Sequence, residues 1–142
     1  MPSKIRMIGI VDDDLIYQFM LHRIIMRNNL AEKIVTFSDG EKAIQYLTDN
    51  KGTNENIPDV IFLDTNMPIL DGWQFVEKYA KIKVEIKKKV IIYMLSSSIK
   101  PADLQRASEI SEICGYIIKP IQLEGLKIIL HKCETFLKGL NL

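Results

Sequence analysis

The chain has 142 residues, of which 47% are hydrophobic, enough for one domain with its own core and too few for two domains of ordinary size. Its 19 basic and 18 acidic side chains give a formal net charge of +1, so no overall field favours nucleic acid, an anionic membrane or an acidic substrate. No apolar stretch is long enough to span a bilayer, and the start MPSKIRMIGI leads into a strand pattern instead of a cleavable leader. We therefore expect a cytoplasmic, single-domain protein covering 1–142, with a core of about 4–138 and no membrane or nucleic-acid partner.

The two cysteines, Cys114 and Cys133, lack CxxC spacing and have no cluster of metal-ligating residues nearby. A zinc site or a disulfide framework therefore has little support. We expect both to be buried free thiols.

The first half of the chain alternates two predicted strands with two predicted helices. Residues 5–11 are a short apolar run, typical of a buried strand, and 33–37 are β-branched and aromatic, as in a second strand. Apolar side chains recur at roughly helical spacing in 15–26 and predict a helix that turns them toward the core: Leu15, Phe19, Met20, Ile24 and Ile25. The pair Ser38 and Glu41 matches a capping box and predicts the start of a second helix.

The second half repeats this alternation three times. Strands are predicted at 60–63, 90–95 and 116–118. Helices are predicted at 72–81, from Pro101 to about Ile113 with Gly115 ending it, and in a last amphipathic segment from Leu123. Five repeats of strand then helix predict a parallel sheet with helices on both faces, because such crossovers are right-handed. We predict an α/β, flavodoxin-like doubly wound (βα)5 fold, with a five-stranded parallel sheet of order 2-1-3-4-5.

Polar residues follow the predicted strands at the points where the strands end. The first strand leads to Asp12 and Asp13, the third to Asp64, the fourth to Ser96 and the fifth to Lys119. In a doubly wound sheet, ligands bind outside the carboxyl ends of the strands, so these side chains should converge. Close carboxylates repel one another unless a cation compensates them, and an oxygen-lined site with open positions suits Mg²⁺.

Such a site has the parts for phosphoryl transfer to a carboxylate. One carboxylate oxygen can attack phosphorus while a cation, an ammonium and a hydroxyl neutralise charge on the equatorial oxygens. Lys119 and Ser96 are the residue types that this chemistry needs.

Four motifs in the chain resemble the response-regulator receiver domain of two-component signalling, over nearly the whole length. They are VDDD at 11–14, LDTNMPILDG at 63–72, MLSS at 94–97 and YIIKP at 116–120, in the family's order and on the matching strands. The resemblance implies a bacterial type of signalling module that is a phosphoacceptor and not an enzyme with an external substrate.

The resemblance also implies a role for each residue of the site. Asp64 would accept the phosphoryl group, Asp13 and Asp64 would bind Mg²⁺ directly, with Mn²⁺ as a possible substitute, and Asp12 would act mostly through a metal-bound water. The main-chain carbonyl of Asn66 would be the third protein ligand. Lys119 would pair with the phosphoryl group, and the bond between Lys119 and Pro120 would be cis.

Signal output is expected to involve two switch residues. By the same resemblance Ser96 bonds the phosphoryl group, with Ser97 as the alternative hydroxyl, and Tyr116 turns inward. These movements would change the face formed by the fourth helix, fifth strand and fifth helix. Asn66 and Ser98 would tune the lifetime of the phosphoryl group. We interpret Asp14, the third acid in the first motif, as a helix N-cap in preference to a metal ligand.

The function that these expectations favour is that of a stand-alone receiver without an output domain, a monomer or weak homodimer. It would take a phosphoryl group from a sensor histidine kinase or histidine phosphotransfer protein, and then bind a downstream protein or pass the group on. An alternative is an Mg²⁺-dependent aspartyl-phosphate phosphatase, which would want an acid at position 66, where this chain has Asn66. A nucleotide-binding flavodoxin-like module would want a glycine-rich loop where this chain has VDDDL.

Overall fold

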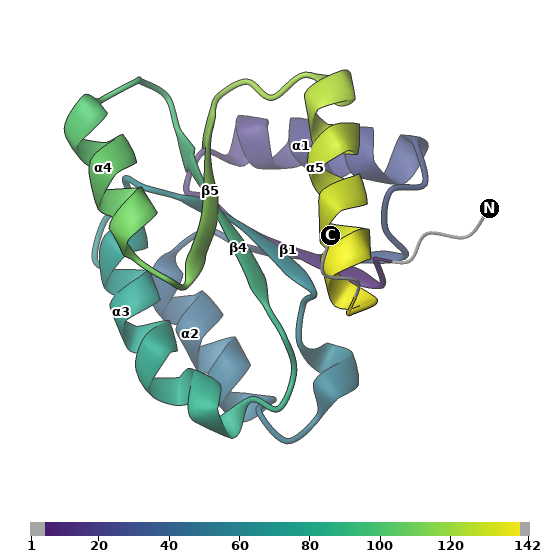
Figure 1. Cartoon of the computed structure of the whole chain (residues 1–142), viewed down its shortest axis with the longest axis vertical. Coiled ribbons are helices and arrows are strands. Elements are labelled where there is room, and N and C mark those ends of the chain that lie inside the picture. The colour runs from purple at the N-terminus through teal and green to yellow at the C-terminus, as the bar shows by residue number, and fades with distance from the viewer. Residues whose placement is uncertain (1–4, 140–142) are drawn as a thin grey trace.

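A computed structural model describes residues 5–139, in which five parallel strands form one sheet of order β2-β1-β3-β4-β5 (Figure 1). The predicted fold class and strand order are confirmed. Residues 1–4 and 140–142 of the predicted 1–142 domain lie outside the described residues. Within 5–139, no helix is both long and apolar enough to cross a membrane. The elements are, in chain order, β1 (Met7–Val11), α1 (Leu15–Arg27), β2 (Lys33–Phe37), α2 (Gly40–Asp49), the 3-10 helix η1 (Asn54–Asn56), β3 (Val60–Asp64), α3 (Gly72–Ile82), the 3-10 helix η2 (Lys83–Glu85), β4 (Ile91–Ser96), α4 (Pro101–Glu109), β5 (Ile113–Ile118) and α5 (Leu123–Leu137).

Helices cover both faces of the sheet, α1 and α5 on one side and α2, α3 and α4 on the other (Figure 1). Alternate residues of the strands supply the two cores, because successive side chains of a strand point to opposite faces. In β3, Phe62 belongs to the core beneath α1 and α5, whereas Leu63 belongs to the core beneath α2, α3 and α4. This arrangement leaves the carboxyl ends of the strands between the two helical layers.

The buried side of α1 differs from the predicted one. Tyr17, Leu21 and Ile25 face the core, whereas Leu15 and Phe19 are each 63% exposed. Met20 is also exposed, and of the predicted core residues only Ile25 is fully buried. The helix is apolar on more than one side, so spacing alone could not identify the side that faces the sheet.

Two predicted boundaries were also wrong. Helix α4 ends at Glu109, before the predicted Ile113, and Gly115 lies inside β5, opposite Tyr93. A Cβ at this glycine would lie 2.5 Å from Cε1 of Tyr93, so Gly115 makes room for an aromatic ring and does not end a helix. The N-cap of α2 is Asp39, whose Oδ1 accepts a hydrogen bond from the Lys42 amide at 2.8 Å, instead of the predicted Ser38.

Three further predictions concern single residues. The N-cap role of Asp14 is confirmed, since its side chain accepts from the amides of Ile16 and Tyr17. The cis bond between Lys119 and Pro120 is confirmed as well. Both cysteines are free thiols, but only Cys133 is buried and Cys114 is exposed on β5, so the prediction for Cys114 was wrong.

Candidate functional site

Three acidic residues meet at the carboxyl ends of the two neighbouring strands β1 and β3. Asp12 and Asp13 follow β1, and Asp64 is the last residue of β3. One carboxylate oxygen from each lies within 4.8 Å of the others. Asp12 and Asp64 are buried, at 0% and 6% exposure, whereas Asp13 is exposed to solvent. The cluster therefore has a buried floor and an open side.

The loop that carries the first two acids is fixed by its own hydrogen bonds. Asp12 Oδ1 accepts from the Asp14 amide at 2.9 Å, and Asp14 in turn caps α1. From α1, the Gln18 amide nitrogen Nε2 donates to the main-chain oxygens of Asp12, at 3.2 Å, and Phe37, at 3.1 Å. These contacts join the ends of β1 and β2 to the first turn of α1, so the Asp12 backbone has little freedom.

The loop that follows Asp64 is held close to its strand. The Asn66 amide donates to Asp64 Oδ1 at 3.3 Å, and the Gly72 amide donates to the Thr65 carbonyl at 3.0 Å. A Cβ at position 72 would lie 2.5 Å from the Asp64 carbonyl oxygen, so only glycine fits where α3 begins. Helix α3, capped by Asp71, therefore starts directly against the acidic cluster.

Lys119 supplies the one ammonium that the described residues bring into contact with this cluster. Its Nζ lies 2.7 Å from Asp12 Oδ2 and 3.7 Å from Asp64 Oδ1, and its side chain is 12% exposed. The Lys119 amide also donates to the Ser96 carbonyl at 2.7 Å, which places the ends of β4 and β5 side by side. The predicted convergence of strand-end residues is therefore present.

The charges of the cluster are not balanced. Burial, and next the neighbouring Asp12 carboxylate, raise the pKa of Asp64 to about 7, against the opposing effect of Lys119. Burial disfavours the Lys119 ammonium, but the contacts with Asp12 and Asp64 outweigh this and raise its pKa. The Lys119 ammonium pairs with Asp12 and Asp64 but not with Asp13, and all three carboxyl groups offer oxygen ligands. This donor set fits a hard divalent cation such as Mg²⁺ or Mn²⁺.

The predicted switch residues lie on β4 and β5, next to the cluster. Ser96 is 1% exposed, and its Oγ donates to the Ser98 carbonyl at 2.9 Å, whereas Ser97 is exposed. Tyr116 is half-buried, and its hydroxyl has no hydrogen-bond partner within 5–139. A second polar atom without such a partner is the hydroxyl of Thr65, the residue after Asp64.

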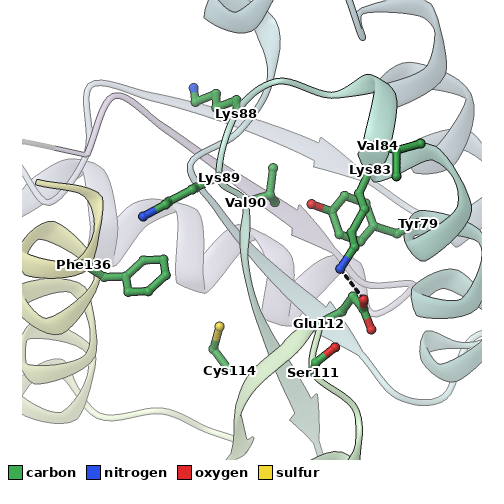
Figure 2. A pocket seen from close by; sticks show the side chains of 10 residues that line it. All are labelled: Tyr79, Lys83, Val84, Lys88, Lys89, Val90, Ser111, Glu112, Cys114 and Phe136. Carbon is green, nitrogen blue, oxygen red and sulfur yellow. Dashed lines mark hydrogen bonds and ion pairs between the residues drawn. The ribbon is translucent and has the colours of Figure 1, made fainter. Parts of the chain in front are cut away.

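A cavity of ≈ 360 Å³ lies away from this site, near the amino ends of β4 and β5 (Figure 2). Its lining includes Lys89, Phe136 and the ion pair between Lys83 and Glu112. No residue of the acidic cluster lines it. The cavity is therefore separate from the candidate site.

Tyr17, whose ring centroid lies 4.7 Å from Lys119 Nζ, and Gln18 are site residues that sequence reasoning missed. Both lie on α1 and not at a strand end, so the rule that located the acids and Lys119 does not reach them. Tyr17 could have been identified only by placing its ring on the buried side of α1, which the apolar spacing did not indicate.

Comparisons with known proteins agree with this geometry. A family model described as the response regulator receiver domain matches residues 8–131. The crystal structure of a two component response regulator from Cytophaga hutchinsonii superposes with a TM-score of 0.84 at 29% identity, covering 92% of this chain and 98% of that one.

Two curated relatives are similar in sequence. The probable methanogenesis regulatory protein FilR2 of Methanothrix harundinacea is 25% identical over 132 residues, which cover 93% of this chain and 83% of that protein. The transcriptional regulatory protein YpdB of Escherichia coli is 29% identical over 128 residues, which cover 89% of this chain. The match spans only 46% of YpdB, so less than half of that protein is represented here.

A doubly wound sheet with an acidic cluster and a lysine at its carboxyl edge defines the class of this protein. The chain belongs to the response regulator receiver domain family, whose members are phosphoacceptor signalling modules of two-component systems. This membership does not favour the phosphatase alternative.

Proposed function

We propose that the protein accepts a phosphoryl group on Asp64 and transmits the change through its surface. The observation that carries this proposal is the position of the Asp64 carboxylate, buried between two further carboxylates and 3.7 Å from the Lys119 ammonium. A carboxylate so placed is a nucleophile with its charge-neutralising partners already in position.

The metal site of this proposal consists of Asp12, Asp13 and Asp64, with the main-chain carbonyl of Asn66 as a further ligand. Asp13 and Asp64 would bind directly, and Asp12 through water. When bound, Mg²⁺ or Mn²⁺ would neutralise charge on the phosphoryl oxygens and on the three carboxylates. Burial and the Asp12 carboxylate raise the pKa of Asp64, and a bound cation would offset both effects by stabilising the ionised carboxylate.

The transfer itself uses residues of this chain. A carboxylate oxygen of Asp64 attacks phosphorus in line with the departing group, which is an imidazole nitrogen when the donor is a phosphohistidine. The phosphorus–nitrogen bond breaks as the phosphorus–oxygen bond forms, and the imidazole leaves with the electron pair and takes a proton from water. Lys119 stabilises an equatorial oxygen by its charge, and the Ser96 hydroxyl donates to another.

The donor in this proposal is a sensor histidine kinase or a histidine phosphotransfer protein. It would dock against an apolar surface of α1 formed by Leu15, Ile16, Phe19 and Met20, which are 48–75% exposed. This surface begins at Leu15, two residues after Asp13, which is the exposed acid of the cluster. Exposed apolar side chains next to a reactive centre suit a partner that must bring its own reactive residue to that centre.

The output is expected on the face formed by α4, β5 and α5. Ser96 would leave the Ser98 carbonyl for the phosphoryl group, and Tyr116 would act as the aromatic switch. Support comes from the Ser96 hydrogen bond, which is local and exchangeable, and from the Tyr116 hydroxyl, which is buried without a partner within 5–139. A downstream protein would recognise the changed face.

Incubation with Mg²⁺ and acetyl phosphate, followed by intact mass measurement, tests the proposal. We expect one phosphoryl adduct on the wild-type protein, labile at alkaline pH, and none on Asp64→Asn. Equal labelling of both proteins would show that Asp64 is not the acceptor. Rapid turnover of a general phosphomonoester would instead indicate a phosphatase.

A further inference from the structure

Tyr17 connects α1 to the segment that carries Lys119. It lies in the first turn of α1, is 9% exposed, and packs in the same core as Leu21 and Ile25 on the buried side of that helix. Packing alone would make it an ordinary core residue. The ring and the hydroxyl of Tyr17, however, make polar contacts that the side chains of Leu21 and Ile25 cannot make.

The ring and the hydroxyl of Tyr17 contact neighbouring parts of one loop. Lys119 Nζ lies 4.7 Å from the ring centroid, a cation–π geometry. The hydroxyl accepts a hydrogen bond from the Ile121 amide at 3.5 Å. One side chain of α1 therefore touches residues on both sides of Pro120.

These contacts bear on where the Lys119 ammonium can lie. A lysine side chain has a flexible four-carbon stem, and holding its end in one place loses conformational freedom. Asp12, at 2.7 Å, draws the ammonium away from Asp64, at 3.7 Å. The aromatic face is an uncharged third partner, which restricts the ammonium without competing for a phosphoryl group as a carboxylate would.

We infer that Tyr17 is a positioning residue for phosphoryl transfer, whose ring holds the Lys119 ammonium within reach of the group on Asp64. The inference rests on the proposed function of Asp64 and adds the residue that orients its cationic partner. Tyr17 acts through Lys119 and does not itself contact the reacting atoms. The ring is the part that matters, because the hydrogen bond to Ile121 is long.

Two substitutions separate the ring from the hydroxyl. Tyr17→Phe keeps the aromatic face, and Tyr17→Leu keeps apolar bulk but removes that face. Phosphorylation by phosphoramidate with saturating Mg²⁺ is followed by intact mass at several donor concentrations. We expect Tyr17→Leu to lower the maximal rate constant by about 5- to 30-fold, the range for a partly desolvated cation–π contact, with little change in the donor concentration at half-maximal rate. Tyr17→Phe should stay within about 2-fold of the wild type.

A matched control on the same side of α1 distinguishes positioning from stability. Leu21→Ala removes buried apolar contacts at a residue that is 1% exposed and belongs to the same core. At a temperature well below its unfolding midpoint it should keep the wild-type rate constant. If Leu21→Ala slows transfer as much as Tyr17→Leu, or if Tyr17→Leu matches the wild type, the inference is overturned.

One measurement needs only the wild-type protein, in case Tyr17→Leu does not fold. The ring should shift the Cε methylene protons of Lys119, which are next to Nζ, upfield in the NMR spectrum, and the absence of this shift would contradict the inference. If wild type takes no phosphoryl group, or Asp64→Asn takes one, the proposed function fails and this inference with it. Equal rates in the Phe and Leu variants would overturn the inference alone.

Discussion

The protonation state of the Asp64 carboxyl depends on its surroundings. Its pKa is raised to about 7 by burial and then by Asp12, whereas the same carboxyl in an unfolded chain titrates near pH 4. Below about pH 7 the folded, metal-free protein therefore favours the protonated form. The stability from this group is fully present below about pH 4 and is lost as the pH rises through about 7.

Replacing Asp64 by Asn should remove this pH dependence. An amide is neutral at every pH, so without metal the variant should gain stability relative to the wild type as the pH rises from 4 to 8. A rise of about three pKa units corresponds to about 4 kcal/mol, and screening by solvent at the open side of the cluster lowers the expected gain in the free energy of unfolding to the order of 2 kcal/mol. Urea unfolding with EDTA at a series of pH values measures it. A difference between the two proteins that does not vary with pH would show that the Asp64 pKa is not raised.

Some site residues could be predicted from the sequence and others could not. Asp12, Asp13, Asp64 and Lys119 follow apolar runs, and parallel strands bring their carboxyl ends to one edge, so their convergence follows from order along the chain. Tyr17 is different, because its contact with Lys119 depends on the rotation of α1 about its axis. That rotation is set by packing and was not encoded in a clear apolar stripe.

At the level of elements, α1 has two apolar sides with different roles. Tyr17, Leu21 and Ile25 lie against the sheet, and the second side, with Phe19, is exposed to solvent. Sequence spacing weights both sides alike, which is why the predicted core side was wrong. Gly115 is a comparable case. A glycine is needed there because the ring of Tyr93 on the neighbouring strand fills the space of a side chain, and the local sequence does not show that contact.

The two sides of α1 should respond differently to substitution. Leu21→Ala leaves a cavity in the core and should lower the free energy of unfolding by about 2–5 kcal/mol. Phe19→Ser changes a side chain that is 63% exposed, and its effect should stay within about 0.5 kcal/mol. Chemical denaturation of the two variants beside the wild type provides the comparison. A larger loss in Phe19→Ser than in Leu21→Ala would mean that α1 is rotated from the orientation described here.

Across the whole molecule, the carboxyl ends and the amino ends of the strands carry different polar groups. Opposite the acidic cluster, Asp59 precedes β3, is 7% exposed, and forms an ion pair with Lys88 at 2.9 Å. It also accepts a hydrogen bond from the Arg6 amide at 2.9 Å. The Asp59 carboxylate joins the start of β1 to the loop before β4, so it stabilises the fold.

Removing the Asp59 carboxylate should affect stability without affecting the chemistry. Asp59→Ala leaves the Lys88 ammonium, whose side chain is 15% exposed, without its carboxylate partner, and should destabilise the protein by about 3 kcal/mol. The rate of phosphorylation by acetyl phosphate should remain that of the wild type while the protein is folded. Thermal unfolding measures the stability, and intact mass measures the rate of phosphorylation. Slower phosphorylation of the folded variant would show that the amino and carboxyl ends of the strands are coupled.

The central claim is that Asp64 carries the phosphoryl group, and chemical trapping tests it most directly. After incubation with Mg²⁺ and acetyl phosphate, borohydride reduces an aspartyl phosphate to homoserine, and peptide mass mapping then locates the reduced residue. We predict reduction at Asp64, dependent on Mg²⁺ and acetyl phosphate. Reduction at Asp12 or Asp13 with Asp64 intact would contradict the account.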